Sequence, residues 1–480
     1  MDKKKKGLVQ ILGPSMVIDA EPILKQFAED HSFAKPNQPS LLVKPENTGE
    51  IREIIKWANA TKTPLVPVSS GPPHFNGDTV PTSADAVMVD LSRMKKIIKV
   101  DRRNKMALIE PGVTYEQLQP ALAENGLRLS STLHPKANKS VVASLLEREP
   151  RLIPRYQWAM LDPLRCLEVV WGDGNVFTTG EVSRPGQLER EWQKKFAQVM
   201  AAGPAQVDFY KLVSAAQGSM GIVSWASVKC EILPELHELF LIPSTNIEDL
   251  LNFGYQILKY RFGDEIFLLN NVSLGRLMGE GSELPPWVLV VAIAGRNVLP
   301  RERVDYQLND IREIARKHGL ELLRSIGNCE SSEILHKALN PSRKPYWKFR
   351  HKGDCRDIFF LTTLDKTPEL VASVRETVKA HGYPASDIGI YLQPVHQGAS
   401  CHAEFSLPFD PQSSKEISVI EKTYVETSKV LLSQGAYFSR PYHVWADMVF
   451  KKDAMAAVLL KKIKSVFDPN NIMNPGKLCF

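Results

Sequence analysis

A loop with two glycines, placed directly after an apolar run, constrains this chain more than any other feature of its sequence. The apolar run is 64–68, and the loop reads Pro67-Val68-Ser69-Ser70-Gly71-Pro72-Pro73-His74-Phe75-Asn76-Gly77-Asp78. This pattern predicts a strand that ends in a tight turn. Because glycine lacks a Cβ, backbone N–H groups in such a turn can approach an anion closely. Most loops of this kind are ordinary turns, so the prediction needs support from the rest of the chain.

Four further segments give that support, because they follow the loop in a characteristic order. Their sequences are ALIEPGV at 107–113, KSVVAS at 139–144, QGSMGIV at 217–223 and FDPNNIMNPGK at 467–477. Together with the loop, they resemble the FAD-binding oxidoreductases of the vanillyl-alcohol oxidase and p-cresol methylhydroxylase type (the PCMH type). The resemblance covers most of residues 39–234 and the C-terminal tail.

Length and composition narrow the class of protein. A chain of 480 residues is too long for a single hydrophobic core, so two or more domains are expected. Its 43% apolar and 24% charged residues are typical of a soluble globular protein. The net charge of +6 is small for this length, and the Lys3–Lys6 run predicts a solvated N-terminal extension. No basic stripe interleaved with aromatic residues occurs, which argues against nucleic acid as a partner.

The sequence also bears on the compartment. No apolar run reaches the roughly 18 residues of a membrane-spanning helix, so no membrane span is expected. The segment 7–17 lacks the continuous apolar stretch and the cleavage site of a signal peptide. The six cysteines are scattered without a CxxC pair, which argues against a zinc ribbon or an iron–sulfur cluster in the chain. A reduced, cytoplasmic setting is the simplest interpretation.

Hydrophobic patterns predict the main elements. A helix is expected at 48–61, and two short β runs across Gly172-Asp173-Gly174 predict a hairpin. Beyond Pro234, strands alternate with long helices, which suits a cap over a cofactor domain. A short helix is expected near 20–28 and a terminal helix at 452–467.

The expected fold class is α+β, with a two-subdomain PCMH-type FAD-binding domain and an α+β cap. The expected parts are an N-terminal extension at 1–38, the FAD-binding domain at 39–234, the cap or substrate domain at 235–440 and a segment at 441–480 that returns to the FAD domain.

The resemblance implies a set of cofactor-binding residues for FAD. Backbone donors of the loop at 69–77 would hold the pyrophosphate, although Pro72 and Pro73 have no N–H to offer. The segments at 139–144 and 217–223 would run along the adenine–ribityl side and the flavin ring, with Lys477 near the flavin. The expected residues are Ser69, Ser70, Gly71, His74, Phe75, Asn76, Gly77, Pro111, Gly112, Ser140, Val141, Ser144, Gly218, Ser219, Gly221, Ile222, Val223 and Lys477.

The flavin linkage stays open at this point. His74 stands one position away from the histidine that some relatives link covalently to flavin, so a covalent bond through it is the less favoured alternative.

Polar groups in the second half of the chain suggest a substrate side. In 391–396 and 401–405, alternation directs Tyr391, Gln393, His402 and Glu404 toward one face of adjacent strands. Such groups can bind a metal, remove a substrate proton or make structural hydrogen bonds. No metal is predicted, because the His-rich metal motif of 2-hydroxy-acid-oxidising relatives is missing from the cap; whether His396, His402 and Glu404 bind one stays open.

Arg440 matches the arginine with which phenol-oxidising relatives hold an anionic substrate, while Ser439 replaces their tyrosine. A guanidinium suits a carboxylate or a phenolate. We therefore expect Arg440 to anchor an anionic substrate, with His402 or Tyr391 as the base or orienting group.

These observations predict an FAD-dependent dehydrogenase. It would take a hydride from an alcohol, hydroxy acid or aryl C–H substrate and pass the electrons to a separate acceptor, such as an iron–sulfur or other electron-transfer protein. One alternative is an electron-transfer flavoprotein subunit without its own small-molecule substrate. Another is a relative of the fold that has lost FAD. The substrate, the acceptor and the oligomeric state, a homo-oligomer included, stay open.

Overall fold

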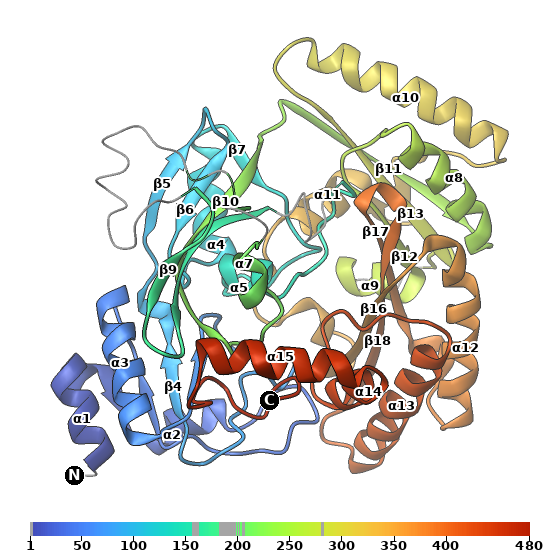
Figure 1. The fold of residues 1–480 in the computed structure, drawn as a ribbon. Helices are drawn as coiled ribbons and strands as arrows, with labels where there is room; N and C mark the ends of the chain where they lie inside the picture. The colour runs from blue at the N-terminus through green and yellow to red at the C-terminus, as the bar shows by residue number, and fades with distance from the viewer. Residues whose placement is uncertain are drawn as a thin grey trace.

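The strands of the protein form three large sheets (Figure 1). In this computed structural model, the described residues are 3–155, 163–181, 198, 200, 202–203, 207–279 and 283–480.

The first sheet carries the glycine loop at its edge. Its four strands lie in the order β1-β2-β4-β3, with β2, β4 and β3 parallel and β1 antiparallel to β2. Helix α3 (Thr48–Thr61), which confirms the predicted helix, packs on it through Ile51, Ile54 and Ile55. The strands are β1 (Val17–Ile18), β2 (Leu41–Val43), β3 (Leu65–Val68) and β4 (Val87–Asp90).

The second sheet is antiparallel, in the order β5-β6-β10-β8-β9, and the predicted hairpin is present as β8–β9. A further strand, β7, pairs with one end of β10. Three short helices pack against it: α4 (Tyr115–Ala123), α5 (Val141–Leu146) and α7 (Tyr210–Val213). The strands are β5 (Ile97–Asp101), β6 (Met106–Ile109), β7 (Leu127–Leu129), β8 (Leu164–Trp171), β9 (Val176–Thr178) and β10 (Gly221–Ile232).

The third sheet belongs to the second half of the chain and is also antiparallel, in the order β11-β13-β12-β17-β18-β16. The strands are β11 (Leu236–Ser244), β12 (Ile266–Asn270), β13 (Trp287–Gly295), β16 (Asp354–Thr362), β17 (Gly389–Val395) and β18 (Ser400–Phe409), and a small hairpin adds β14 (Ser325–Ile326) and β15 (Cys329–Glu330).

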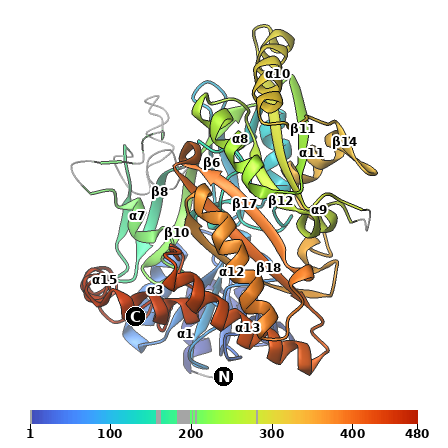
Figure 2. The same ribbon diagram turned by 90° about the vertical axis from the view of Figure 1, so that its right-hand side faces the viewer.

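Helices cover the two faces of the third sheet unequally (Figures 1 and 2). The outer face packs on four long helices: α8 (Ile247–Lys259), α10 (Pro300–Lys317), α12 (Thr367–Ala380) and α13 (Ser414–Ser433). The inner face packs on α9 (Asn271–Met278) and α11 (Ser331–Leu339) and also contacts Leu133 and Leu152 from the first half of the chain.

The C-terminal tail pairs with the first sheet. Leu65 N–H donates to the Ile472 carbonyl (2.8 Å), and Asn474 N–H donates to the Leu65 carbonyl (2.8 Å). The amide of Asn474 also donates to the carbonyls of Asp78 (2.8 Å) and Gln217 (2.7 Å). The tail therefore ties the end of the glycine loop to the turn at 217–221.

One predicted feature differs from the structure. The lysine run starts helix α1 (Lys3–Leu12), which packs Leu8 against α3, and β1 joins the first sheet, so this segment is not a solvated extension. The predicted terminal helix at 452–467 is present as α15 (Ala454–Phe467), and a further helix, α14 (Val444–Lys452), precedes it. Asp453 separates them because its carboxylate accepts the N–H of Ala456 (3.0 Å) and caps α15. The predicted helix near 20–28 is present as α2 (Glu21–Leu24) and a following 3₁₀ turn.

Throughout the described ranges, every helix is too short or too polar to cross a lipid bilayer.

Candidate cofactor and substrate sites

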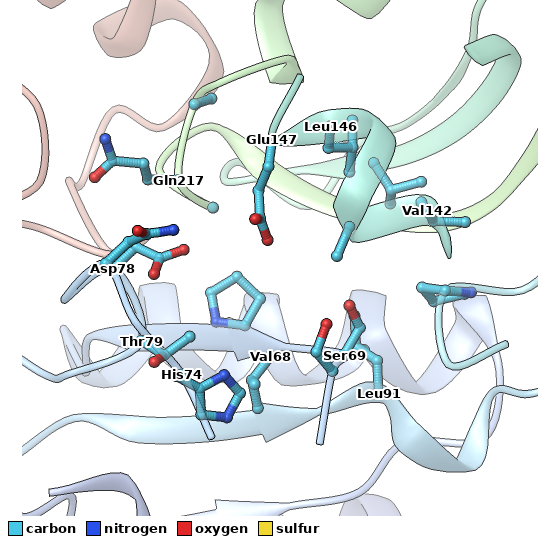
Figure 3. A pocket seen from close by; sticks show the side chains of 18 of the residues that line it. Val68, Ser69, His74, Asp78, Thr79, Leu91, Val142, Leu146, Glu147 and Gln217 are labelled. Atoms are coloured by element: carbon cyan, nitrogen blue, oxygen red, sulfur yellow. The ribbon is translucent and has the colours of Figure 1, made fainter. Parts of the chain in front are cut away.

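A cavity of about 140 Å³ lies where the first two sheets meet. The main parts of the chain that line it are the loop after β3, the segment from Lys136 to Glu147 and the segment from Val213 to Val223, and Leu91, Pro111 and Tyr442 complete the lining (Figure 3). Segments far apart in the sequence therefore converge on one space.

Ten of the expected cofactor-binding residues line this cavity. They are Ser69, Ser70, His74, Phe75, Asn76, Pro111, Gly218, Gly221, Ile222 and Val223. Gly218 has φ +69°, and a Cβ there would lie 2.5 Å from Pro67 Cγ, so the turn needs glycine.

The other eight expected residues are not part of the lining. They are Gly71, Gly77, Gly112, Ser140, Val141, Ser144, Ser219 and Lys477. The N–H groups of Gly71 and Gly77 donate to the Asn138 carbonyl (2.9 Å) and to Asp30 Oδ2 (2.6 Å). These two glycines shape the loop, and their N–H groups are already engaged.

Lys477 and Ser140 also have structural partners. Lys477 Nζ donates to the carbonyls of Gly77 and Val80, both at 2.7 Å, and so fastens the end of the loop. Ser140 Oγ accepts the N–H of Ala143 (3.0 Å) and donates to the Pro111 carbonyl (2.5 Å), which caps helix α5. Both side chains support the wall of the cavity from behind.

The middle of the loop offers donors to an anion. In the described part of the chain, no group accepts a hydrogen bond from the backbone N–H of His74, Phe75 or Asn76. All three residues line the cavity. Neighbouring unpaired N–H groups in a turn can bind a phosphate. These donors directly follow Pro72 and Pro73, which have no N–H.

Four charged residues of the cavity wall were not predicted: Asp78, Lys136, Lys139 and Glu147. In Figure 3 the carboxylates of Asp78 and Glu147 point into the same space. Burial and then the charge of Glu147 raise the pKa of Asp78 to about 7. The sequence offered one signal for Asp78, which is its position next to Gly77. The other three charged residues stand within or beside the predicted segment 139–144.

The two lysines differ in their environment. Lys139 Nζ lies 2.6 Å from both carboxylate oxygens of Glu147, and although burial opposes its charge, Glu147 and Glu149 raise its pKa. Lys136 Nζ donates to the carbonyls of Gly71 (3.0 Å) and Pro73. Burial and then the charge of Lys139 lower the pKa of Lys136 to about 7. Lys139 therefore stays positively charged, whereas Lys136 titrates near neutral pH.

His74 faces the cavity as a neutral side chain. Burial, and then the charge of Lys136, lower its pKa to about 3. Its Nε2 atom is buried and has no hydrogen-bond partner in the structure.

The inner face of the cap sheet brings the predicted substrate-side residues together. The strands β17 and β18 pair Tyr391 with Glu404 and Gln393 with His402, so all four side chains share one face, as predicted. Tyr391 Oη donates to Gln393 Oε1 (2.9 Å), and the rings of Tyr391 and His402 lie 5.8 Å apart.

Lys348 joins this group, and the sequence did not single it out. Its Nζ lies 2.6 Å from Asp357 Oδ2 and 2.5 Å from Glu404 Oε1. Although burial opposes its charge, the two carboxylates raise the pKa of Lys348. His402 Nε2 lies 3.6 Å from Glu404 Oε2 and has no hydrogen-bond partner, and burial lowers the pKa of His402.

Arg440 lies close to these residues, and 8% of it is exposed. Its guanidinium stacks 4.1 Å from the centre of the Phe359 ring, and the ring of His402 lies 6.1 Å from the same ring. It donates one long hydrogen bond, from Nη1 to the Glu147 carbonyl (3.4 Å). No carboxylate in the described ranges lies within ion-pair distance of it. The lining of the cavity does not include Arg440, His402 or Tyr391. It does include Tyr442, whose ring centre lies 6.2 Å from that of Phe359.

The described residues include no group of three or more His, Cys, Asp or Glu side chains arranged to hold a metal ion. His396, one of the residues considered for this role, is exposed in the turn after β17.

Comparisons with known proteins agree with this architecture. Residues 39–180 match the family model described as an FAD binding domain, and residues 445–478 match the C-terminal domain of FAD linked oxidases. The glycolate oxidase subunit GlcD of Bacillus subtilis is 22% identical, over 99% of this chain and 96% of that protein. The mitochondrial D-lactate dehydrogenase [cytochrome] of Arabidopsis thaliana is 23% identical, over 98% of this chain and 79% of its own.

Relatives of the p-cresol type match in sequence and in fold. The flavoprotein subunit of 4-cresol dehydrogenase [hydroxylating] from Pseudomonas putida is 31% identical over 157 residues, 32% of this chain and 29% of that protein. The crystal structure of p-cresol methylhydroxylase with substrate bound superposes with a TM-score of 0.83 at 18% identity, over 100% of this chain and 96% of that one.

The fold, the cavity and these matches define the class of protein: it is an enzyme, an oxidoreductase that binds FAD. More closely, the chain belongs to the FAD-linked oxidoreductases of the vanillyl-alcohol oxidase and p-cresol methylhydroxylase type. The interpretation as a relative that has lost FAD is therefore set aside.

Proposed function

We propose that the protein is a dehydrogenase for small hydroxy acids. It removes a hydride from the carbon that bears the hydroxyl group, binds the carboxylate of the substrate through Arg440, and passes the electrons to a separate acceptor. FAD, when bound, supplies the hydride acceptor. The residues described above supply binding, orientation and the proton acceptor.

The observation that carries this proposal is the environment of Arg440. Its guanidinium is almost completely buried, yet no described carboxylate forms an ion pair with it. A buried charge is costly unless it is paired. A substrate carboxylate would supply a direct ion pair, which the more distant Glu149 does not, and the planar guanidinium can bind both carboxylate oxygens.

His402 is the proposed base. Burial lowers its pKa, so the imidazole is neutral near pH 7 and can accept a proton. Its Nε2 atom has no other partner, whereas Glu404 lies 3.6 Å away, near enough to stabilise the charged form once it is produced. His402 can therefore take the hydroxyl proton while hydride leaves the neighbouring carbon.

Tyr391 is the proposed orienting group. Burial raises its pKa well above 10, so its hydroxyl stays protonated, and it already donates to Gln393. When substrate binds, the same O–H can turn to donate to the oxygen of the substrate hydroxyl, whose own proton goes to His402.

On the cofactor side, we assign the pyrophosphate to the N–H groups of His74, Phe75 and Asn76, with Lys136 nearby. The unpaired donors, which all belong to residues of the cavity lining, fit this group. The turn from Gln217 to Val223 would lie along the flavin.

The relatives support the substrate class. Glycolate and D-lactate, which stand in the names of two of them, are both 2-hydroxy carboxylates. The absence of a CxxC pair and the scatter of the six cysteines support an external electron acceptor.

The test is to compare acids with alcohols. FAD-loaded protein would be mixed anaerobically with D-lactate, glycolate and the matched diols 1,2-propanediol and ethylene glycol, and flavin bleaching would be followed. We expect bleaching by an acid, and Arg440→Met should lower kcat/KM for it roughly hundredfold. Arg440→Lys, which keeps the positive charge but not the planar guanidinium, should lower kcat/KM less.

If Arg440→Met lowered kcat/KM equally for the acid and for its matched diol, Arg440 would not bind the carboxylate. Reduction by a protein partner only, and by no small acid or alcohol, would overturn the proposal in favour of an electron-transfer subunit.

A further inference from the structure

Helix α15 presents apolar side chains to solvent. Met455 is 74% exposed, Val458 47%, Leu459 57% and Val466 67%. These are four of the twelve large hydrophobic residues exposed among the described residues, and they lie on a single helix of 14 residues. Figure 1 shows α15 in front of the other elements, and Figure 2, turned by 90°, shows it at the left-hand edge of the molecule, with its outer side uncovered. An exposed apolar surface of this kind marks a site of interaction.

Lysines surround these apolar residues. The exposed charged residues of α14, α15 and the junction between them include Lys451, Lys452, Lys461 and Lys462, against Asp447 and Asp453. Asp453 is engaged in capping α15. The surface of α15, defined here by Met455, Val458, Leu459 and Val466 with the four lysines, therefore has an apolar centre and a positive rim, which is complementary to an acidic partner.

The inner side of the same helix supports the cofactor cavity. Lys464 Nζ donates to the Ser219 carbonyl (2.5 Å) and to the Met473 carbonyl (3.0 Å) and pairs with Asp468 (2.7 Å). Ser219 stands between Gly218 and Met220, which both line the cavity. The ring of Phe467 packs 4.3 Å from that of Trp171. The inner side of α15 thus contacts the turn that we assign to the flavin.

We propose that the surface of α15 is the docking site for the electron acceptor, a protein with an acidic surface around an apolar patch and a one-electron metal centre. This inference rests on the proposed function, which requires an external acceptor. Oxidation of one hydroxy acid releases two electrons and two protons. Two acceptor molecules would each take one electron, and the protons would pass to water.

The position over the cavity favours this occupant over a lipid surface or a second copy of the chain, since neither of these would need to lie near the flavin. The names of two relatives point the same way, one as a dehydrogenase [cytochrome] and one as a flavoprotein subunit.

The test does not require a known substrate. FAD-loaded protein would be reduced with dithionite under argon and mixed in a stopped-flow instrument with an oxidised acidic blue-copper protein, or with neutral benzoquinone. The quinone can reach the flavin without protein docking. The variants are Lys461→Glu/Lys462→Glu and Leu459→Gln. The matched control is Leu299→Gln/Arg316→Glu/Lys317→Glu, which has the same change in charge as the lysine variant. Leu299 is 59% exposed, Arg316 and Lys317 are exposed as well, and all three lie at or on α10, outside this surface.

We expect the lysine variant to lower the second-order rate constant with the copper protein about tenfold, and added salt to lower the wild-type rate. Leu459→Gln should lower it several-fold, and the control variant should leave it unchanged. Rates with benzoquinone should stay the same in all four proteins.

Wild-type rates with the copper protein in both α15 variants would overturn the inference. So would binding of the protein to anionic lipid vesicles that Leu459→Gln abolishes, or a dimer that Leu459→Gln dissociates in sedimentation. Because the flavin is reduced chemically, none of these results depends on whether hydroxy acids are the substrates.

Discussion

The cofactor cavity and the inner face of the cap differ in the groups that form their walls. The wall of the cavity consists of turns, small residues and backbone groups together with four charged side chains, and its shape depends on glycine at places such as Gly218. The inner face of the cap is walled by buried charged and aromatic side chains, with Lys348 held between Asp357 and Glu404. Turns leave a recognisable local pattern in a sequence, whereas a buried ion cluster is assembled from separate strands.

This contrast predicts that the two regions fail in different ways. A substitution in the cap cluster should leave a charge uncompensated, whereas one in the cofactor region should displace backbone. The following predictions test this difference.

The largest effect is expected for Lys348→Met. It would leave the carboxylates of Asp357 and Glu404 buried without their cation, at a cost of about 3–5 kcal/mol in the free energy of unfolding. Urea unfolding followed by tryptophan fluorescence would measure this. Lys352→Met is the control, because Lys352 is more exposed and pairs with Asp387 (2.9 Å), so its loss should cost less than about 1 kcal/mol. Equal losses would show that the cap cluster contributes no more than a surface pair.

Gly112→Ala should have an intermediate effect. A Cβ at Gly112 would lie 2.6 Å from the Leu91 carbonyl oxygen and 2.7 Å from that of Met94, so the backbone must move, at about 1–3 kcal/mol. Gly254→Ala is the control: a Cβ there meets no atom within 4 Å, and alanine should stabilise helix α8 by about 0.5–1 kcal/mol. Thermal unfolding of both variants would check the opposite signs. If Gly112→Ala left the stability unchanged, the backbone of this turn would be shown to shift at little cost.

Asp78→Asn should have the smallest effect, visible as a change in pH dependence. The pKa of Asp78 is raised to about 7 in the folded protein from an ordinary value of 3.8. A raised folded pKa means that its contribution to stability is complete below pH 4 and is lost as pH rises toward 7. Because the side chain is half-buried beside an open cavity, we expect a loss of about 1 kcal/mol across this window. Asparagine cannot ionise, so the variant should lack this part of the slope; an unchanged slope in urea unfolding between pH 4 and 7 would contradict the assignment.

Much of the fold could be predicted from local pattern. The helix at 48–61 and the hairpin across Gly172-Asp173-Gly174 follow from hydrophobic spacing and turn residues, and both are present. The terminal helix at 452–467 is also present, as α15, and Asp453 caps its start. The preceding helix α14 was not predicted. The N-terminal segment was missed because the packing of Leu8 on α3 depends on a partner 40 or more residues away.

The sequence by itself determined the class of protein and the stretches of chain that form the cofactor cavity, since loop, turn and tail motifs are local and their order is preserved. It also placed Tyr391, Gln393, His402 and Glu404 on one face, because alternation along a strand is a property of the backbone. Only the tertiary structure decided which members of each motif reach the cavity, and that Lys348 joins Asp357 and Glu404. Those facts depend on how distant segments fit together, and contacts between distant segments leave no periodic signal in a single chain.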